Sequence, residues 1–307
     1  MRTALSFEIA SRITKNIPYF RGLGKLCRLY DTLLLNQKIN PMATANMKDG
    51  TQILVDLRSN TEVGAFYFGH YDTNLINTIS SIINPNANFL DIGANIGFYT
   101  IAIANIQKKM NGCGRVIAFE PFCNNYQRLL KNIEENNLDE KCLAYNLGLS
   151  NESTNKTLVL REDFENGSQT GNASIAIDQV YDRDFTKIHI YLETLDNIYQ
   201  DLTEEIDIIK IDIEGHEDFC LKGSQETIRI YRPVLLMEVN KPYYKARRVN
   251  IDELFFPLFP KEYSIFAYIS GTWKRIESFS KLGTIDNVFV VPNERLDLDK
   301  YNSVFAF

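Results

Sequence analysis

The chain has 307 residues, of which 45% are hydrophobic and 23% charged, an ordinary balance for a globular protein with a sizeable core. Its formal net charge of -6 argues against nucleic acid as the main partner. Five scattered cysteines include no C-x-x-C pair, so we expect reduced thiols rather than disulfides. No apolar stretch approaches the ~18 residues of a membrane span and the N-terminus lacks a signal-peptide core, so we expect a cytoplasmic protein.

The first 40 residues are predicted to form a basic helical extension, with two short helices on either side of Pro18. Leu5, Ile9 and Ile13 fall on one face of the first helix. Residues 1–38 contain seven Lys or Arg and two acids, a net of +5 that leaves -11 for the rest. The extension fits either a cap on the main domain or a peripheral contact with an anionic membrane, and we favour the cap.

Residues 43–57 are predicted to form a β-hairpin that turns at Lys48-Asp49-Gly50. The aromatic-rich segment that follows contains Tyr67, His70 and Tyr71. Such side chains either cover a cofactor and line an acceptor pocket, or simply fill the core.

Residues 88–100 predict a buried strand, a tight turn and the start of an apolar helix over residues 96–110. Gly93 and Gly97 bracket the turn, where a missing side chain lets a ligand approach the backbone. A dinucleotide fingerprint would need a third glycine at Phe98, which disfavours an NAD-dependent oxidoreductase or epimerase. Asp91 precedes the turn and suits a ligand with a sulfonium and an ammonium group, as in motif I of S-adenosylmethionine (SAM) methyltransferases, which this spacing resembles.

Further strands are predicted at residues 115–121 and 142–146, and strands that alternate with helices indicate a doubly wound, mostly parallel sheet. Ligands of such sheets bind beyond the carboxyl ends of the strands. Glu120 at one such end is placed to accept hydrogen bonds from two ribose hydroxyls. The residues expected at these ends are Asp91, Gly93, Glu120, Asn146 and Gly148.

Residues 151–187 interrupt this alternation with polar, turn-rich sequence that includes Asn172. A long irregular segment in a compact domain is usually functional or mobile. We interpret it either as a loop that selects the acceptor or as a flexible surface excursion.

A second cluster of charged residues follows a buried strand at residues 206–211, and a fifth strand over residues 233–239 contains another acid. Methyl transfer requires a group that removes a proton from the acceptor. The available bases are Asp212, Glu214, His216 and Glu238. Alternatively, Lys210 and these acids form a structural network at the strand ends. The sequence does not establish the geometry that a metal would need, so no metal site is predicted.

With both clusters, the chain resembles the FkbM family of SAM-dependent methyltransferases. The resemblance covers roughly residues 50–292. The matching stretches are residues 89–97, 116–121, 193–196, 210–217 and 232–238, with a family-like closing strand at residues 286–292. His216 stands where many relatives have a small residue.

The resemblance implies a Rossmann-like class I methyltransferase domain over residues 41–307, with an antiparallel closing strand, that methylates a hydroxyl. The acceptor would be a sugar in a glycan, a glycolipid or a related secondary metabolite; a non-catalytic SAM-binding protein is the alternative. The expected cofactor-binding residues are Asp91, Gly93, Ala94, Asn95, Gly97, Glu120, Pro121, Asn146, Gly148 and Asp212. The expected catalytic residues are Asp212, Glu214, His216 and Glu238.

Overall fold

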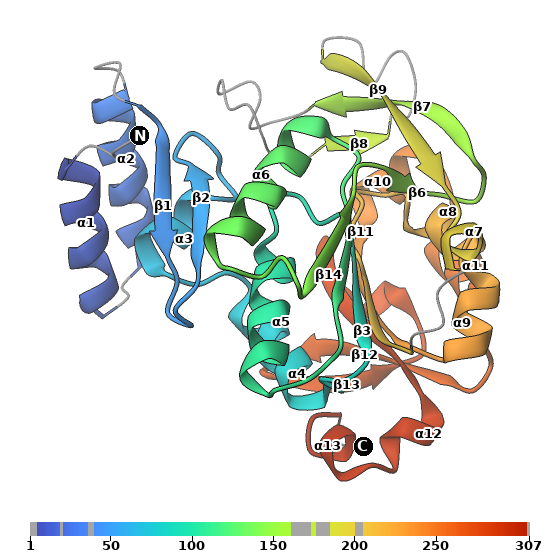
Figure 1. Ribbon diagram of the computed structural model, residues 1–307. Coiled ribbons are helices and arrows are strands. Elements are labelled where there is room, and N and C mark those ends of the chain that lie inside the picture. Colours follow the sequence, from blue (N-terminus) through green and yellow to red (C-terminus); the bar gives the residue numbers. More distant parts are fainter. Residues whose placement is uncertain are drawn as a thin grey trace.

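The computed structural model describes residues 5–18, 21–35, 40–160, 173–175, 185–199 and 205–305. Helices cover both faces of a central sheet, and a smaller sheet lies at one end of it (Figure 1). The central sheet has eight strands in the order β13-β12-β14-β11-β10-β3-β4-β5. Its strands are β3 (Asn88–Ile92), β4 (Val116–Phe119), β5 (Cys142–Tyr145), β10 (Ile206–Ile211), β11 (Val234–Asn240), β12 (Tyr263–Ile269), β13 (Thr272–Ile276) and β14 (Ile285–Pro292).

The predicted strand directions are confirmed. Strands β5, β4, β3, β10 and β11 pair in parallel, and β14 pairs antiparallel with β11. Two further antiparallel strands, β12 and β13, extend the sheet beyond β14. Every residue of β3, β4 and β10 is buried, which explains why β4 is wholly apolar and why β3 and β10 are mostly apolar.

Alternate residues of the strands enter two separate cores. Phe89 packs with the helices on one face, whereas Leu90 and Ile92 pack with those on the other. The first face is covered by α4 (Thr73–Ile82), α5 (Phe98–Lys109) and α6 (Cys123–Glu135). The second face is covered by α7 (Leu195–Tyr199), α8 (Glu217–Lys222), α9 (Gln225–Tyr231), α10 (Lys241–Ala246) and α11 (Ile251–Phe255). The sheet is therefore doubly wound, as predicted.

The described part of residues 151–187 corrects the prediction of an irregular segment. It contributes strands to a second sheet, whose order is β6-β9-β7-β8. These strands are β6 (Gly148–Leu149), β7 (Thr154–Leu160), β8 (Ala173–Ile175) and β9 (Thr186–Glu193). Leu158, Leu160, Ile190 and Leu192 alternate inward and form a small core of their own. Asn172, the acceptor candidate of this segment, lies outside the described residues.

The two N-terminal helices are confirmed as α1 (Leu5–Asn16) and α2 (Leu23–Leu35). The predicted hairpin is confirmed as β1 (Met42–Asn46) and β2 (Gln52–Asp56), followed by α3 (Val63–Phe68). Ile9 and Ile13 share a face of α1 as predicted, but their side chains are 50% and 56% exposed, so this face does not pack on the main domain. The opposite face packs through the fully buried Phe7, and Ser11 Oγ donates to the carbonyl of Phe66 and Thr14 Oγ1 to that of Tyr67.

The C-terminal segment returns to the far edge of the central sheet. It contains α12 (Asn293–Leu296) and α13 (Asp299–Asn302), and two 3-10 turns precede it at Phe256–Leu258 and Phe279–Lys281. Within the described ranges, no helix combines the length and apolarity that would let it cross a membrane.

Candidate active site

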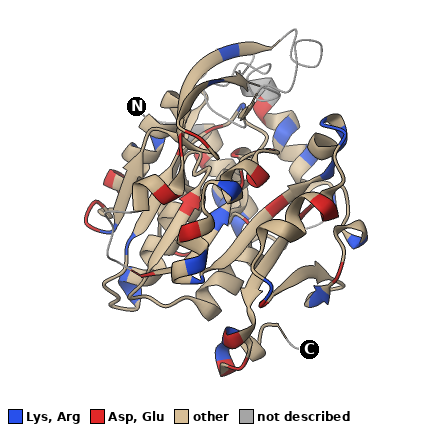
Figure 2. Cartoon of the chain, turned by 90° about the vertical axis from the view of Figure 1, so that its right-hand side faces the viewer, with Lys and Arg blue, Asp and Glu red and all other residues tan. Residues whose placement is uncertain are grey.

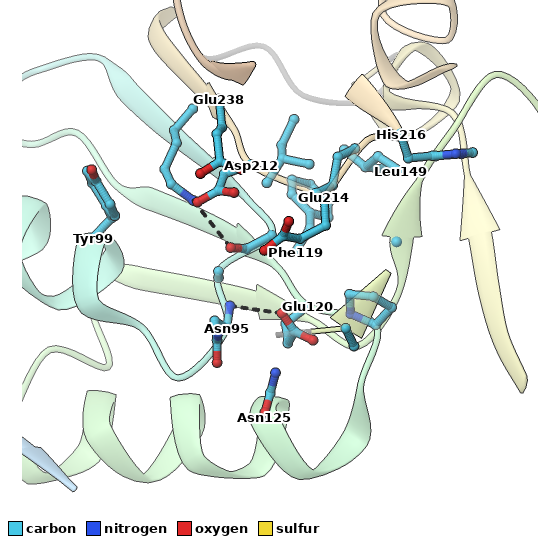
Figure 3. Close-up of a pocket in the computed structure, with 18 of the residues that line it drawn as sticks. Asn95, Tyr99, Phe119, Glu120, Asn125, Leu149, Asp212, Glu214, His216 and Glu238 are labelled. Carbon is cyan, nitrogen blue, oxygen red and sulfur yellow. Dashed lines mark hydrogen bonds and ion pairs between the residues drawn. The ribbon is translucent and has the colours of Figure 1, made fainter. Parts of the chain in front are cut away.

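A cavity opens beyond the carboxyl ends of β3, β4, β10 and β11, the position at which doubly wound sheets bind ligands (Figure 3). The second sheet closes one side of it through apolar side chains. The lining residues are Tyr71, Asp72, Ile92, Gly93, Ala94, Asn95, Phe98, Tyr99, Phe119, Glu120, Pro121, Asn125, Gly148, Leu149, Leu158, Ala173, Ile175, Ile190, Leu192, Lys210, Asp212, Ile213, Glu214, His216, Glu238 and Asn287.

The two glycines of the first motif are required by packing within the chain. Gly93 has a φ of +78°, and a Cβ there would lie 2.0 Å from the carbonyl oxygen of Asp212. Gly97 has a φ of +98°, and a Cβ there would lie 2.6 Å from Leu129 Cδ1. Gly93 lines the cavity and Gly97 does not. The space beside Gly93 is thus occupied by the backbone of Asp212, and the space beside Gly97 by the side chain of Leu129. From the sequence, we expected a ligand to approach the backbone at these positions.

Asp91 lies beneath the cavity and is fully buried. Its Oδ2 accepts a hydrogen bond of 2.6 Å from Thr100 Oγ1, and its Oδ1 lies 3.3 Å from Lys210 Nζ. Lys210 in turn lies 3.4 Å from Asp212 Oδ2. Burial lowers the pKa of Lys210, but the two carboxylates outweigh it and the pKa lies above its usual value. Asp91 therefore acts on the cavity by fixing the lysine that lines it.

Glu120 projects into the cavity just beyond β4 (Figure 3). Its Oε2 accepts from the backbone N–H of Asn95 at 2.8 Å, and its Oε1 from that of Phe122 at 2.9 Å. Burial raises the pKa of Glu120 to about 7, although these two hydrogen bonds favour the ionised form. The carboxylate is thus held rigidly at the strand end where the sequence placed it.

The remaining predicted cofactor residues divide into two groups. Ala94, Asn95, Pro121 and Gly148 line the cavity. Asn146 is exposed and does not line it; its Nδ2 donates to the carbonyls of Glu120 and Pro121 at 2.8 and 3.1 Å. Asn146 thereby supports the turn that carries Glu120.

Three of the four predicted bases come together on one wall of the cavity. Figure 3 shows Asp212, Glu214 and Glu238 gathered on the side opposite Glu120. Glu214 follows β10 with a φ of +53°, so a strained turn places it there. No three His, Cys, Asp or Glu side chains in the part of the chain that the structure describes are arranged to hold a metal ion.

Glu238 is the most perturbed acid of this wall. Its Oε2 is buried and has no hydrogen-bond partner among the described residues. Burial, together with the carboxylates of Asp212 and Glu214, raises the pKa of Glu238 to about 10. A buried carboxyl oxygen without a partner is costly, so Glu238 is a candidate functional residue.

His216 borders the cavity, but its ring points away from the three acids (Figure 3). Its Nε2 lies 2.9 Å from Ser150 Oγ, and the ring stacks on Phe219 with centroids 4.5 Å apart. Burial lowers the pKa of His216 to about 4. The structure does not bring this ring together with the other predicted bases.

The aromatic segment before α4 contributes only Tyr71 of the predicted acceptor residues. Tyr67 is buried in α3, where its hydroxyl donates to Asp31, and His70 is exposed. Tyr71 stacks on Phe98 with ring centroids 4.1 Å apart. Sequence reasoning missed Asp72 and Tyr99, which are joined by a hydrogen bond of 2.9 Å from the tyrosine hydroxyl. The sequence offered one indication of each: Asp72 directly follows Tyr71, and Tyr99 closely follows the glycine motif of residues 93–97.

The family model described as "Methyltransferase FkbM domain" matches residues 91–297. The chain belongs to the FkbM methyltransferase family. A curated relative, the AMB antimetabolite synthetase AmbE of Pseudomonas aeruginosa, is 26% identical over an alignment of 202 residues, and the match covers 56% of this chain but only 9% of AmbE. The chain therefore spans a small part of that relative's length.

Solved structures show weaker likenesses. An FkbM methyltransferase from Methylobacillus flagellatus KT is 18% identical and has a TM-score of 0.42; the match covers 68% of this chain and 44% of that one. A tRNA (uracil-54, C5)-methyltransferase from Pyrococcus abyssi, solved with S-adenosyl-L-homocysteine, is 13% identical with a TM-score of 0.40, and the match covers 81% of this chain and 44% of that one.

As an FkbM methyltransferase, the chain uses SAM, and the cavity fits this cofactor. SAM carries a sulfonium and an ammonium group, and the cavity wall offers carboxylates that attract both. The acids that line the cavity are Asp72, Glu120, Asp212, Glu214 and Glu238, and Lys210 is the only Lys or Arg among the described lining residues. Glu120 and the backbone of residues 93–95 are the groups that would hold the nucleoside end.

Proposed function

We propose that this methyltransferase transfers the methyl group of SAM to a hydroxyl of a sugar or a related small molecule. The observation that carries the proposal is the buried Oε2 of Glu238, which faces the cavity without a hydrogen-bond partner among the described residues. A hydroxyl can donate to this oxygen and lose its proton to it. The neighbouring acids Asp212 and Glu214 suit the adjacent hydroxyls of a sugar.

SAM, when bound, supplies an electrophilic methyl carbon. Glu238 then acts as the base that accepts the proton of the acceptor hydroxyl. Cationic charge in the cavity favours the ionised carboxylate, so we expect cofactor binding to lower the pKa of Glu238 from about 10 toward neutrality. Lys210, fixed between Asp91 and Asp212, keeps Asp212 oriented toward the reacting groups.

A second cavity, of about 310 Å³, offers a place for the acceptor. It shares Ile175, Glu214 and His216 with the first cavity, so a molecule bound there would adjoin the acidic wall. Its other lining residues include Asn151, Tyr243 and Arg247. Aromatic, amide and guanidinium groups are common partners of sugar rings and their hydroxyls.

The test is Glu238→Gln, which keeps the shape of the side chain but removes the base. We expect kcat to fall about 10²- to 10⁴-fold while the Kd for SAM changes little. The exposed Glu262→Gln is the matched control and should leave kcat unchanged. Transfer of labelled methyl groups to sugars, nucleotide sugars and amino sugars, with the product identified by NMR, gives the rate and the methylated atom.

Full activity in Glu238→Gln would remove the proposed base. A methylated nitrogen in the product would contradict hydroxyl transfer. SAM binding without turnover of any acceptor class would instead support the alternative of a non-catalytic SAM-binding protein.

A further inference from the structure

The N-terminal helices expose apolar side chains in two regular stripes. Ile9, Ile13 and Ile17 recur every four residues along α1 and just past its end, and they are 50%, 56% and 39% exposed. Leu26 and Leu29 are three residues apart on α2 and are 56% and 59% exposed. Residues at these spacings share one face of a helix, so each helix presents an apolar stripe outward.

Basic side chains accompany these stripes. Arg12, Arg21, Lys25 and Arg28 are exposed, whereas the exposed acid of the two helices is Glu8. Asp31 is buried, accepts a hydrogen bond from the Tyr67 hydroxyl and offsets part of the charge of Arg28, so the surface of the two helices stays basic overall. In contrast, acidic and basic residues are interspersed on the side of the molecule shown in Figure 2, which faces away from α1 and α2.

Both helices already pack on the body of the protein through other side chains. The exposed stripes are therefore not needed for packing on the main domain. Ser11 and Thr14 bond to carbonyls of α3 at 2.7 and 2.6 Å. The rings of Phe7 and Tyr30 meet edge to face between α1 and α2, with centroids 6.1 Å apart. Figure 1 shows the two helices at the outer edge of the molecule, where a flat surface can reach them.

We propose that α1 and α2 form a docking surface for an anionic lipid bilayer. Helices of this kind lie in the interface with apolar side chains inserted and basic ones against lipid headgroups. The net charge of +5 in residues 1–38 and -11 in the remainder orients the molecule, because the bilayer attracts the first part and repels the second. A second copy of the chain is disfavoured, because a two-fold contact would place the same basic surface against itself.

The proposal is tested by co-sedimentation of the full chain with phosphatidylcholine vesicles, with and without phosphatidylglycerol. We expect binding only to the anionic vesicles, and less of it at about 0.5 M salt. Arg12→Glu with Lys25→Glu should weaken binding by at least about 25-fold, at roughly fivefold for each positive charge lost. Ile13→Ser with Leu26→Ser should weaken it about tenfold or more.

Matched controls change the same residue types elsewhere: Lys274→Glu on β13 and Ile230→Ser on α9, whose side chain is 59% exposed. These should bind vesicles like the unchanged chain. Every variant should keep its melting temperature and its affinity for SAM, since the altered residues lie outside both cavities. A negative result in the vesicle-binding experiment would therefore not affect the assignment as a methyltransferase.

Three results would overturn the proposal. One is an absence of vesicle binding, and another is equal binding to neutral and anionic vesicles. The third is a dimer in sedimentation equilibrium that Ile13→Ser with Leu26→Ser dissociates, which would assign the surface to a second copy of the chain.

Discussion

Gly93 combines a left-handed backbone with an unusually close neighbour. Its φ is +78°, and the carbonyl oxygen of Asp212 lies 2.0 Å from where a Cβ would stand. Gly93→Ala must therefore displace the turn after β10 that carries Asp212 and Glu214. We expect it to lower the free energy of unfolding by about 3 kcal/mol or more, measured by urea denaturation.

Gly64→Ala is the control for this substitution. Gly64 lies in α3, and no atom lies within 4 Å of its would-be Cβ. We expect a change of less than about 1 kcal/mol, in the stabilising direction, since alanine favours a helix. Equal effects of the two substitutions would refute the idea that chain packing requires Gly93.

Glu238 should make stability depend on pH. Its pKa is raised from 4.5 to about 10 in the folded chain, so between these values the folded state holds a proton that the unfolded state has released. Its contribution to stability is complete below pH 4.5 and is lost as the pH rises. In the absence of ligands, the free energy of unfolding should therefore fall as the pH rises above 4.5, by at most about 1.4 kcal/mol for each pH unit.

Glu238→Gln isolates this effect. Glu120 and Glu217 also have raised pKa values, but they are present in both proteins and cancel in the comparison. The difference in unfolding free energy between Glu238→Gln and the unchanged chain should therefore grow as the pH rises from 5 toward 9. Parallel stability curves would show that Glu238 ionises normally in the folded protein.

At the scale of elements, the strands with a strong pattern of apolar residues could be predicted from the sequence. The parallel strands were recognisable because burial on both faces favours apolar residues, as throughout β4 and at every position of β10 except Asp207 and Lys210. The second sheet was missed because β7 begins with polar, exposed residues and only its last three are buried. A short strand with one buried face gives a weak signal.

Which face of α1 packs inward could not be predicted from the spacing of its isoleucines. Ile9 and Ile13 are exposed, whereas Ser11 and Thr14 face α3, where backbone carbonyls accept hydrogen bonds from their hydroxyls. Within the site, Asp91 and Gly97 were recognisable as motif residues, but their partners Lys210 and Leu129 come from distant elements. Which residue lines the cavity and which supports it depends on such long-range contacts, which one sequence does not reveal.

The second sheet should hold up one wall of the cavity. Leu192 on β9 is 1% exposed, lines the cavity and lies beneath Gly148, whose would-be Cβ is 2.6 Å from Leu192 Cδ2. Leu192→Ala should cost about 2–4 kcal/mol of unfolding free energy by leaving a void. It should also weaken SAM binding about tenfold in calorimetric titration, because the wall loses its support.

Tyr191→Ala is the control on the same strand. Its side chain is 45% exposed on the opposite face of β9. Stability and SAM affinity should both stay close to those of the unchanged chain. An unchanged SAM affinity in Leu192→Ala, despite lost stability, would show that this sheet is not part of the cofactor wall.

At the scale of the whole molecule, the C-terminal segment is hydrogen-bonded to the rest of the domain. Arg295 hydrogen-bonds to Asp207 at the start of β10 and to the carbonyl of Arg232 ahead of β11, and Lys300 Nζ donates to the carbonyl of Ile82. Phe305 is fully buried. The family match ends at residue 297, so Lys300 and Phe305 lie beyond the matched part of the chain, yet Phe305 belongs to the hydrophobic core.

Phe305→Ala tests this dependence. The ring packs with Phe266, Phe289 and Trp273 at centroid separations of 4.9, 5.4 and 6.1 Å, on the edge of the sheet farthest from β5. Its removal should lower the free energy of unfolding by about 3–5 kcal/mol in urea denaturation. Leu298→Ala, at a side chain that is 50% exposed, should cost less than about 0.5 kcal/mol. A small effect of Phe305→Ala would mean that the segment after β14 folds independently of the sheet, and a large one makes it part of the cooperative unit that holds the active site.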